Sequence, residues 1–496
     1  MLAHPRSLAL LLSVGVLTGC AVGPDYRRPE IALSPTFIGQ EGVDHRQVQH
    51  KADLTIWWAA FDDPLLTHFV ALALDQNLDI AQAAARVAQS RASLRYADAA
   101  LLPAANVSIT AARGYQSVET PLGQVLNATP GFDRSGSSYE ANLGASWEVD
   151  MFGGLRRGRE AAHAAYEASE AGAVATRLAV AAQTADVYVT IRGLQARIAI
   201  ARQQVETRRQ LFAMVRLQYG KGVAAELQMN QAEGSLTQAE AQIPVLEAGL
   251  DSAMNALDVL LGAQPGTYRT ELAPVAPVPV VPGLAETGTP AEMIRRRPDL
   301  IAAERRLAAA NARIGVAVSE YYPKFSLAAL LGSATAIASG NLFTGAASQA
   351  QGVLGLRWRL FDFGRVDAQI AAARGQEAEA LAAYRLAVLR ATEDVENAIE
   401  ALVKREAQVG ILTRGESSLV RARENSLAAY KGGVVSLIEV LDADGKLLEA
   451  RDAKAQAETE AARAAIASFR ALGGGWDAQH ASSNRLSSNL STNDRR

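Results

Sequence analysis

Two stretches of the chain alternate between apolar and polar residues with the period of two that is typical of β-strands. In residues 139–150 the large apolar side chains fall on one face, and they are Tyr139, Leu143, Trp147 and Val149. Residues 352–361 repeat the alternation with Leu354, Leu356, Trp358 and Leu360. Antiparallel partners are expected at 105–113 and 324–332. The pattern therefore predicts two hairpins, with four strands of about ten residues, the length of a transmembrane strand.

Four strands cannot close a barrel, and an open sheet edge in lipid would leave backbone groups without hydrogen-bond partners. A chain that inserts these strands into a membrane must therefore oligomerise. Three copies would supply twelve strands, an even number within the range of known barrels. The alternative is a pair of solvent-exposed hairpins on a soluble helical protein, in which an apolar face with Trp147 or Trp358 would need another cover.

A long run with helical spacing follows each pair of strands. Residues 153–219 and 364–430 contain no proline, and each predicts a helix on the order of 100 Å long. Glycines at the ends of these runs favour the left-handed conformation that caps a helix, and a return helix follows. They are Gly220 and Gly222 in the first run and Gly432 and Gly433 in the second. Each half is thus expected to contain a helical hairpin whose tip lies far from the strands.

The same order of elements occurs twice, which indicates an internal two-fold repeat. Tyr219 and Tyr430 lie 211 residues apart, and upstream Pro103 and Pro323 lie 220 apart, so the first copy carries nine more residues (220 minus 211) between these points. Each copy is predicted to begin with a helix that a proline ends, at 64–102 or 290–322. The predicted division is a signal peptide at 1–19, a lipidated extended segment at 20–62, repeat one at 63–264, a proline-rich linker at 265–289, repeat two at 290–472 and a disordered tail at 473–496.

The N-terminus predicts export and a lipid anchor. A basic start, an apolar run at residues 8–17 and small residues before Cys20 are typical of a secretory signal peptide, and the run is too short to span a bilayer. The letters LTGC at 17–20 resemble the lipobox at which bacterial prolipoproteins are cleaved and acylated. Cys20, the one cysteine of the chain, is therefore the expected lipid attachment site; the alternative is an ordinary small residue in an uncleaved signal. By resemblance to sorted lipoproteins, Ala21 stands where many of those held at the inner membrane have an aspartate, and its identity favours the outer membrane of a Gram-negative bacterium.

Charge and composition argue against several classes of function. The net charge of −3 provides no basic field for nucleic acid. Six histidines and one cysteine leave little for a metal site, and the motifs of hydrolases, zinc proteases and nucleotide-binding loops do not occur. The chain is thus predicted to be no enzyme and to need no cofactor. Arginine clusters at 156–159 and 295–297 could bind phosphate, but they lie at predicted element junctions without interleaved aromatics, and a solvated face is the simpler interpretation.

Four motifs give the chain a resemblance to a known family. They are the lipobox followed by AVGPDYRRPE at 21–30, DLTIWWAAFDDPLL at 53–66, RRPDLIAAERRL at 296–307, and the duplicated tips. Together they resemble the NodT/OprM branch of the TolC-like outer-membrane efflux proteins, from residue 20 to about residue 472. The resemblance implies an α+β membrane protein, a homotrimer in which four strands per chain form a twelve-stranded transmembrane β-barrel and the long helical hairpins form a periplasmic α-barrel. It also implies the outer-membrane channel of a tripartite efflux pump that exports small molecules. The implied partners are a periplasmic membrane-fusion adaptor, an inner-membrane RND-type transporter and outer-membrane lipid.

The resemblance also assigns roles to residues near the tips. Glu439 and Asp442 match the acidic channel constriction, and a spacing of three puts them on one helix face. Six carboxylates around a three-fold axis would raise one another's pKa and favour cations. Glu439 could instead complete a capping box with Ser436, and Asp442 could simply favour the positive end of the helix dipole.

The turns at the two tips match the family's adaptor-docking surface. They consist of Gly222, Val223, Gly433 and Val434, and their glycines could equally be needed for the turn alone. Gln228 stands where relatives often have an aspartate, so a lock between that position and Tyr430 would be at most a neutral hydrogen bond.

Two other functions stay open at this point. A type I secretion exit duct would keep the channel and change the cargo. A non-conducting lipoprotein scaffold would use the helices to bridge the periplasm, but it would have no use for strands with an apolar face of transmembrane length. A tunnel lined by common polar side chains need not encode its substrate.

Overall fold

The computed structural model describes residues 21–44, 52–284 and 289–476, and these divide into two compact units. The first unit contains the described residues up to Pro29, Ala88–Ala168 and Glu304–Ala383. The second contains Glu30–Val87, Ser169–Ala303 and the described chain from Tyr384 onward. Each unit therefore draws on both halves of the sequence.

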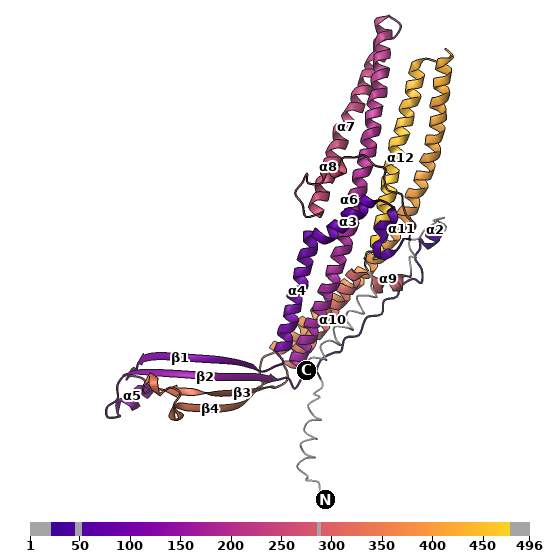
Figure 1. Ribbon diagram of the computed structural model, residues 1–496. Helices are drawn as coiled ribbons and strands as arrows, with labels where there is room; N and C mark the ends of the chain where they lie inside the picture. The colour runs from indigo at the N-terminus through magenta and orange to yellow at the C-terminus, as the bar shows by residue number, and fades with distance from the viewer. Residues whose placement is uncertain (1–20, 45–51, 285–288, 477–496) are drawn as a thin grey trace. The chain divides into compact units, whose positions relative to one another are not determined.

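The first unit contains one antiparallel sheet with the strand order β1-β2-β3-β4 (Figure 1). The strands are β1 (Ala104–Tyr115), β2 (Ser135–Val149), β3 (Lys324–Thr335) and β4 (Ser348–Arg357). β1, β2 and β3 lie where the alternation predicted them, and pairing of β2 with β3 joins the two hairpins into a single sheet. The hairpin loops carry α5 (Pro121–Asn127) in the first, and the short 3₁₀ turns η2 (Ser339–Asn341) and η3 (Gly345–Ala347) in the second.

The last strand begins and ends four residues earlier than predicted. β4 ends at Arg357, whereas the alternation had extended it to 361. Arg357 pairs with Lys324, the first residue of β3, and the next position on that strand would be Pro323. Proline has no N–H to donate, so the ladder cannot continue.

The expected first helix of each half is divided in two. In the first half it consists of α3 (Pro64–Gln76) and α4 (Leu78–Ala99), and in the second of α9 (Pro290–Arg296) and α10 (Pro298–Ser319). Asn77 interrupts the first because its side-chain oxygen accepts from the N–H groups of Asp79 and Ile80 and so starts a new helix. Arg297 interrupts the second because a residue before proline disfavours the helical conformation, and its backbone is extended, with φ −71° and ψ 117°.

The long helices agree with the prediction to within a residue at each end. They are α6 (Gly154–Gly220) and α11 (Arg365–Lys431), of 67 residues each. Each turns back into a helix of 35 residues, α7 (Glu226–Leu260) or α12 (Leu437–Ala471), and the two helical hairpins are visible in Figure 1. Within the residues that the structure describes, no helix combines the length and the apolar character needed to cross a membrane.

The core of the second unit gathers aromatic side chains from the N-terminal segment and the long helices. Trp57, in the 3₁₀ element η1 (Leu54–Phe61), stacks on Phe469 of α12 with ring centroids 5.3 Å apart. Phe69 of α3 and Tyr188 of α6 belong to the same buried cluster. The Tyr188 hydroxyl also donates to Asp63, which caps α3, at 2.8 Å. The motif at 53–66 therefore fills a core that holds the N-terminal segment against the helices.

Shorter elements complete the second unit. α2 (Gln40–Asp44) follows a turn whose N–H groups, from Ile38 and Gly39, donate to Glu396 of α11 at 2.8 and 3.1 Å. α8 (Arg269–Leu272) begins the proline-rich linker, and Leu272 is buried in the aromatic core. Both segments are thus fixed to the long helices.

Candidate functional site

The two acidic residues predicted for the constriction lie in the first turns of α12. Glu439 and Asp442 are both exposed, and their spacing puts them on one face of the helix. Asp442 has a partner: Lys446, one turn further on, donates to its carboxylate at 2.8 Å. This hydrogen bond raises the pKa of Lys446. Each chain therefore presents two carboxylates and one ammonium group on this face.

The capping box expected between Ser436 and Glu439 does not form. Ser436 is the N-cap of α12, but its hydroxyl makes no capping hydrogen bond, because the Glu439 N–H is directed to the backbone carbonyl of Ser436 at 3.2 Å. In the other hairpin, Gln228 accepts a hydrogen bond from the N–H of Ala225 at 3.1 Å. That is the side-chain half of a capping box, so Gln228 stabilises the start of α7.

The two tip turns have the same backbone geometry. Gly222 and Gly433 have positive φ angles of 73° and 75°. The N–H of the valine that follows each glycine donates to the carbonyl five residues earlier, at 2.9 Å in both tips, which completes a Schellman motif. Val223 and Val434 are 76% and 79% exposed, so each tip ends in an apolar side chain. Of the four glycines considered as caps, Gly220 and Gly432 lie outside the left-handed region.

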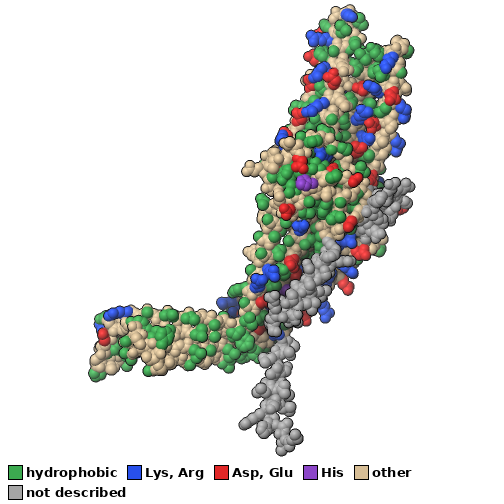
Figure 2. Space-filling view, in the orientation of Figure 1, with side chains coloured by type: hydrophobic (Ala, Val, Ile, Leu, Met, Phe, Trp, Pro, Cys, Tyr) green, Lys and Arg blue, Asp and Glu red, His purple; other side chains and the backbone are tan. Residues whose placement is uncertain are grey.

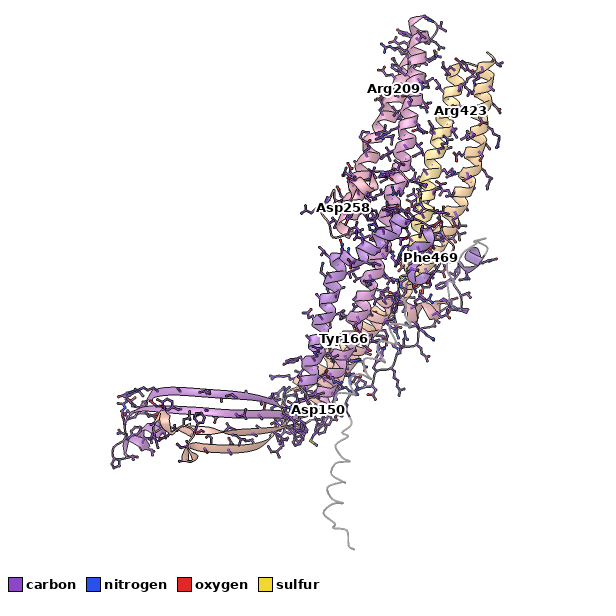
Figure 3. All side chains as sticks on the ribbon, in the orientation of Figure 1. Asp150, Tyr166, Arg209, Asp258, Arg423 and Phe469 are labelled. Carbon is purple, nitrogen blue, oxygen red and sulfur yellow. The ribbon has the colours of Figure 1, made fainter. Side chains whose placement is uncertain are left out.

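Polar contacts join α12 to α6, from the other half of the sequence. The pairs are Thr207 with Asp444, Arg208 with Glu449 and Arg197 with Asp452, at 2.7, 3.0 and 2.8 Å. Figure 3 labels Arg423 of α11, whose Nε lies 3.5 Å from the Asp444 carboxylate. Sequence reasoning had treated these charges as a solvated face and so missed them. They fix the helix that carries Glu439 and Asp442.

Glu416 of α11 binds α12 from the adjacent side. Its carboxylate accepts from Arg451 at 3.0 Å and from Lys454 at 2.9 Å. These hydrogen bonds, that from Lys454 above all, lower the pKa of Glu416. The helix is thus bound on two sides by charged groups, and no signal in the sequence identifies which charges meet.

The sheet has one apolar and one polar face. The strand register aligns Val107, Leu143 and Leu331 across three neighbouring strands, and each is at least half exposed. Polar side chains such as Asn106, Ser108 and Asn142 occupy the alternate positions. In Figure 2, hydrophobic side chains extend along the length of the strands. An exposed apolar surface of this kind marks contact with lipid or with another protein.

Comparison with known proteins identifies the family. The model of the outer membrane efflux protein family matches residues 69–263 and 289–474. The chain belongs to this family. Nodulation protein T of Rhizobium leguminosarum bv. trifolii is 30% identical over 93% of this chain and 96% of its own length. The probable outer membrane lipoprotein SilC of Salmonella typhimurium is 28% identical over 95% of this chain and 98% of its own. The structure of the outer-membrane channel OprN matches with a TM-score of 0.81 and 31% identity, over 92% of this chain and 99% of OprN.

These matches confirm the resemblance to the NodT/OprM branch. This efflux protein is therefore an outer-membrane protein that takes part in export, and it is not an enzyme. Its long helical hairpins and four-stranded sheet are the architecture of the TolC-like channels. In the described ranges of the chain, no group of three or more histidine, cysteine, aspartate or glutamate side chains could hold a metal ion.

Carboxylates pair with four arginines of the two clusters in the efflux protein. Arg156, Arg157 and Arg159 pair with Asp150, Asp25 and Asp98, and Arg297 lies between Asp299 and Asp394. Arg157 also donates to the carbonyl oxygens of Val22 and Gly23, at 3.1 and 3.4 Å. These contacts favour structural roles over phosphate binding. Arg157 fixes the segment that directly follows Cys20, which itself lies outside the described residues.

Proposed function

We propose that three copies of this efflux protein form one exit duct across the outer membrane, as the channel of a tripartite pump. The observation that carries the proposal is the exposed apolar face of the sheet, together with its open edges. In the described chain β1 and β4 each have one neighbouring strand. Such edges are not tolerated in lipid, and three sheets joined edge to edge would give a closed barrel of twelve strands.

The proposed duct continues into a helical tunnel. Each chain supplies two helical hairpins, α6–α7 and α11–α12, and three chains would supply twelve long helices. We attribute the hairpins to an internal duplication, and three observations support this. The long helices have equal lengths, the return helices have equal lengths, and the family match falls into two segments, 69–263 and 289–474. The domain limits at 63–264 and 290–472 follow from the same interpretation.

Glu439 and Asp442 are proposed to line the constriction of the tunnel. Their exposure on one face of α12 supports this role. Lys446 offsets one of the two carboxylates, so a trimer would carry a net charge of about −3 there rather than −6. The ring would still favour cations, but less strongly than six uncompensated carboxylates.

The proposed duct would contact an adaptor protein at its helical tips and lipid at its other end. The apolar turns, with Gly222, Val223, Gly433 and Val434, would dock a periplasmic membrane-fusion adaptor, which would link the duct to an RND-type transporter in the inner membrane. At the other end, acylation of Cys20 would anchor the chain in outer-membrane lipid. The hydrogen bonds from Arg157 to the carbonyl oxygens of Val22 and Gly23 support this placement of the anchor, beside the junction of β2 and α6. We propose small molecules as the cargo and assign no particular compound.

Planar-bilayer conductance tests the duct and the constriction together. The purified wild type is expected to give small cation-selective steps. The double variant Glu439→Gln, Asp442→Asn is expected to give larger steps or to lose the selectivity, because the carboxylate ring is gone. The single variant Glu400→Gln, on an exposed site of α11, is the control and should behave as wild type. Folded and inserted protein that carries no current in either form would contradict the duct.

A type I secretion duct would give similar conductance. It differs in its cargo, so a secretion assay for an unfolded polypeptide distinguishes it. A non-conducting scaffold would give neither current nor heat-resistant trimers.

A further inference from the structure

The edge strands of the sheet determine how neighbouring chains would join. We infer that β4 of one chain pairs antiparallel with β1 of the next in a register that the internal repeat dictates, with Leu356 opposite Ile109 of the partner subunit. The inference rests on the trimer and the duplication proposed above. It adds a specific set of residue contacts, which neither of those proposals contains.

The two hairpins of the sheet have equivalent registers. In the first, Ala105 pairs with Ala145. Adding 220 to 105 and 211 to 145, the two offsets of the sequence repeat, gives Phe325 and Leu356, and these residues pair in the second hairpin. The offsets therefore convert a contact of one half into the matching contact of the other.

A side-chain contact obeys the same rule. The indole N–H of Trp147 donates to the carbonyl of Leu101 at 2.9 Å, and that of Trp358 donates to the carbonyl of Tyr321 at 3.0 Å. Trp358 lies 211 residues after Trp147, and Tyr321 lies 220 after Leu101. The equivalence thus extends beyond the strands to the junctions with the helices.

The pairing of β2 with β3 is the junction between the two halves within one chain. In a closed ring, the pairing of β4 with the partner's β1 is the corresponding junction between chains. Ala145 of β2 pairs with Ala329 of β3. Adding 211 to 145 and subtracting 220 from 329 gives Leu356 and Ile109 of the partner subunit.

The direction of the side chains supports this register independently. Leu356 lies on the apolar face of β4, because its partner Phe325 is two residues from Leu327, which is aligned with Trp147. Ile109 lies on the same face of β1, two residues from Val107. Pairing Leu356 with Ile109 makes the apolar face continuous, whereas a slip by one residue would break it. In the single chain these side chains are 61% and 75% exposed.

A pair of unmatched apolar residues points to the same interface. Phe152, just after β2, stacks on Tyr322, just before β3, with ring centroids 4.6 Å apart. The offsets convert this pair into Phe363 and Leu102 of the partner subunit. Phe363 is fully exposed in the single chain and Leu102 is 65% exposed, so each lacks the cover that its counterpart has.

Disulfide cross-linking tests the register. Leu356→Cys is combined in turn with Val107→Cys, Ile109→Cys and Ala111→Cys in the full chain, and oxidised protein is separated on a denaturing gel without reductant. The pair with Ile109→Cys is expected to form covalent dimers and trimers fastest, because directly opposite Cβ atoms are about 5 Å apart and diagonal ones about 7 Å. Variants that carry only one introduced cysteine, at 107, 109, 111 or 356, show whether Cys20 takes part in any cross-link.

The matched control is Ala145→Cys with Ala329→Cys, the equivalent pair within one chain. It should lose its free thiols without any increase in mass. Fastest cross-linking with Val107→Cys or Ala111→Cys would overturn the register, and no cross-link with any partner, while the control forms, would overturn the pairing itself. Conductance measurements distinguish a failure of the proposed register from a failure of the proposed duct. Current with another register leaves the duct standing, and the expected cross-links without current leave the register standing.

Discussion

Lys446 changes the charge that the first turns of α12 present. Resemblance selected Glu439 and Asp442, and their spacing correctly predicted a shared face. Lys446 follows Asp442 by four residues, a spacing at which opposite charges on a helix meet, and the structure confirms the contact at 2.8 Å. A constriction built from this helix would therefore carry positive as well as negative groups on its face.

We expect Lys446→Gln to increase cation selectivity. In the proposed trimer the change removes three positive charges beside six carboxylates, so the field at the constriction becomes more negative. The measurement is the reversal potential in a potassium chloride gradient. Lys404→Gln is the matched control, since Lys404 lies 3.5 Å from Glu400 in another exposed pair with the same spacing, on α11. An unchanged reversal potential in Lys446→Gln would mean that this ammonium group lies outside the conducting path.

Other residue contacts were beyond the reach of the sequence. The sequence at Ser436 fitted the capping-box motif, but this prediction was wrong. The Glu439 N–H donates to the backbone carbonyl of Ser436 and not to its hydroxyl. Asp444 stood among many charges of an exposed helix, and its contact with Thr207 joins residues 237 apart. A motif records which groups are able to bond, whereas the backbone geometry decides which of them do.

At the scale of elements, periodicity predicted most of the fold. Long helices and alternating strands are set by local side-chain patterns, so α6, α11 and the strands β1 to β3 lie where they were expected, whereas β4 lies four residues earlier. The breaks at Asn77 and Arg297 were missed, although the proline after Arg297 was a visible signal. The sequence signal at Asn77 was weaker. Its side-chain amide also donates to the carbonyl of Leu260 at the end of α7, and only the folded chain brings these two groups together.

The tip turn gives a prediction at this scale. Gly433→Ala is expected to destabilise the turn by roughly 1–2 kcal/mol, because its φ of 75° is costly for a residue with a Cβ. Amide hydrogen exchange at Val434 should then accelerate roughly 5- to 30-fold. Gly432→Ala is the control, since this neighbour lies outside the left-handed region and has room for a methyl group. Equal exchange in both variants would contradict a conformational role for Gly433.

At the scale of the whole molecule, the N-terminal segment makes contacts with several of the long helices, although little of it is helical. Arg157 holds it at the start of α6, and Glu396 holds it at α11. Trp57 then enters the aromatic core against Phe469, close to the end of the last helix. The segment therefore connects elements from both halves of the sequence.

We expect Trp57→Ala to destabilise the second unit by about 3–5 kcal/mol, because it leaves a large cavity in a closely packed core. The temperature at which the helical circular dichroism signal is lost should fall accordingly. Ile56→Ala is the control, since Ile56 is the preceding residue and is 51% exposed, whereas Trp57 is 1% exposed. A similar loss of stability in both variants would show that η1 contributes through its backbone and not through the buried ring.

The sequence by itself determined most of the elements, their order and the family. Each of these depends on side-chain patterns within one segment or on likeness between segments. Only the tertiary structure decided that β2 pairs with β3, that Lys446 and Glu416 have particular partners, and that Arg157 holds the N-terminal segment. These contacts depend on distances and directions between groups in the folded chain. Hydrophobic burial and hydrogen-bond geometry select them from many alternatives that the same sequence pattern allows.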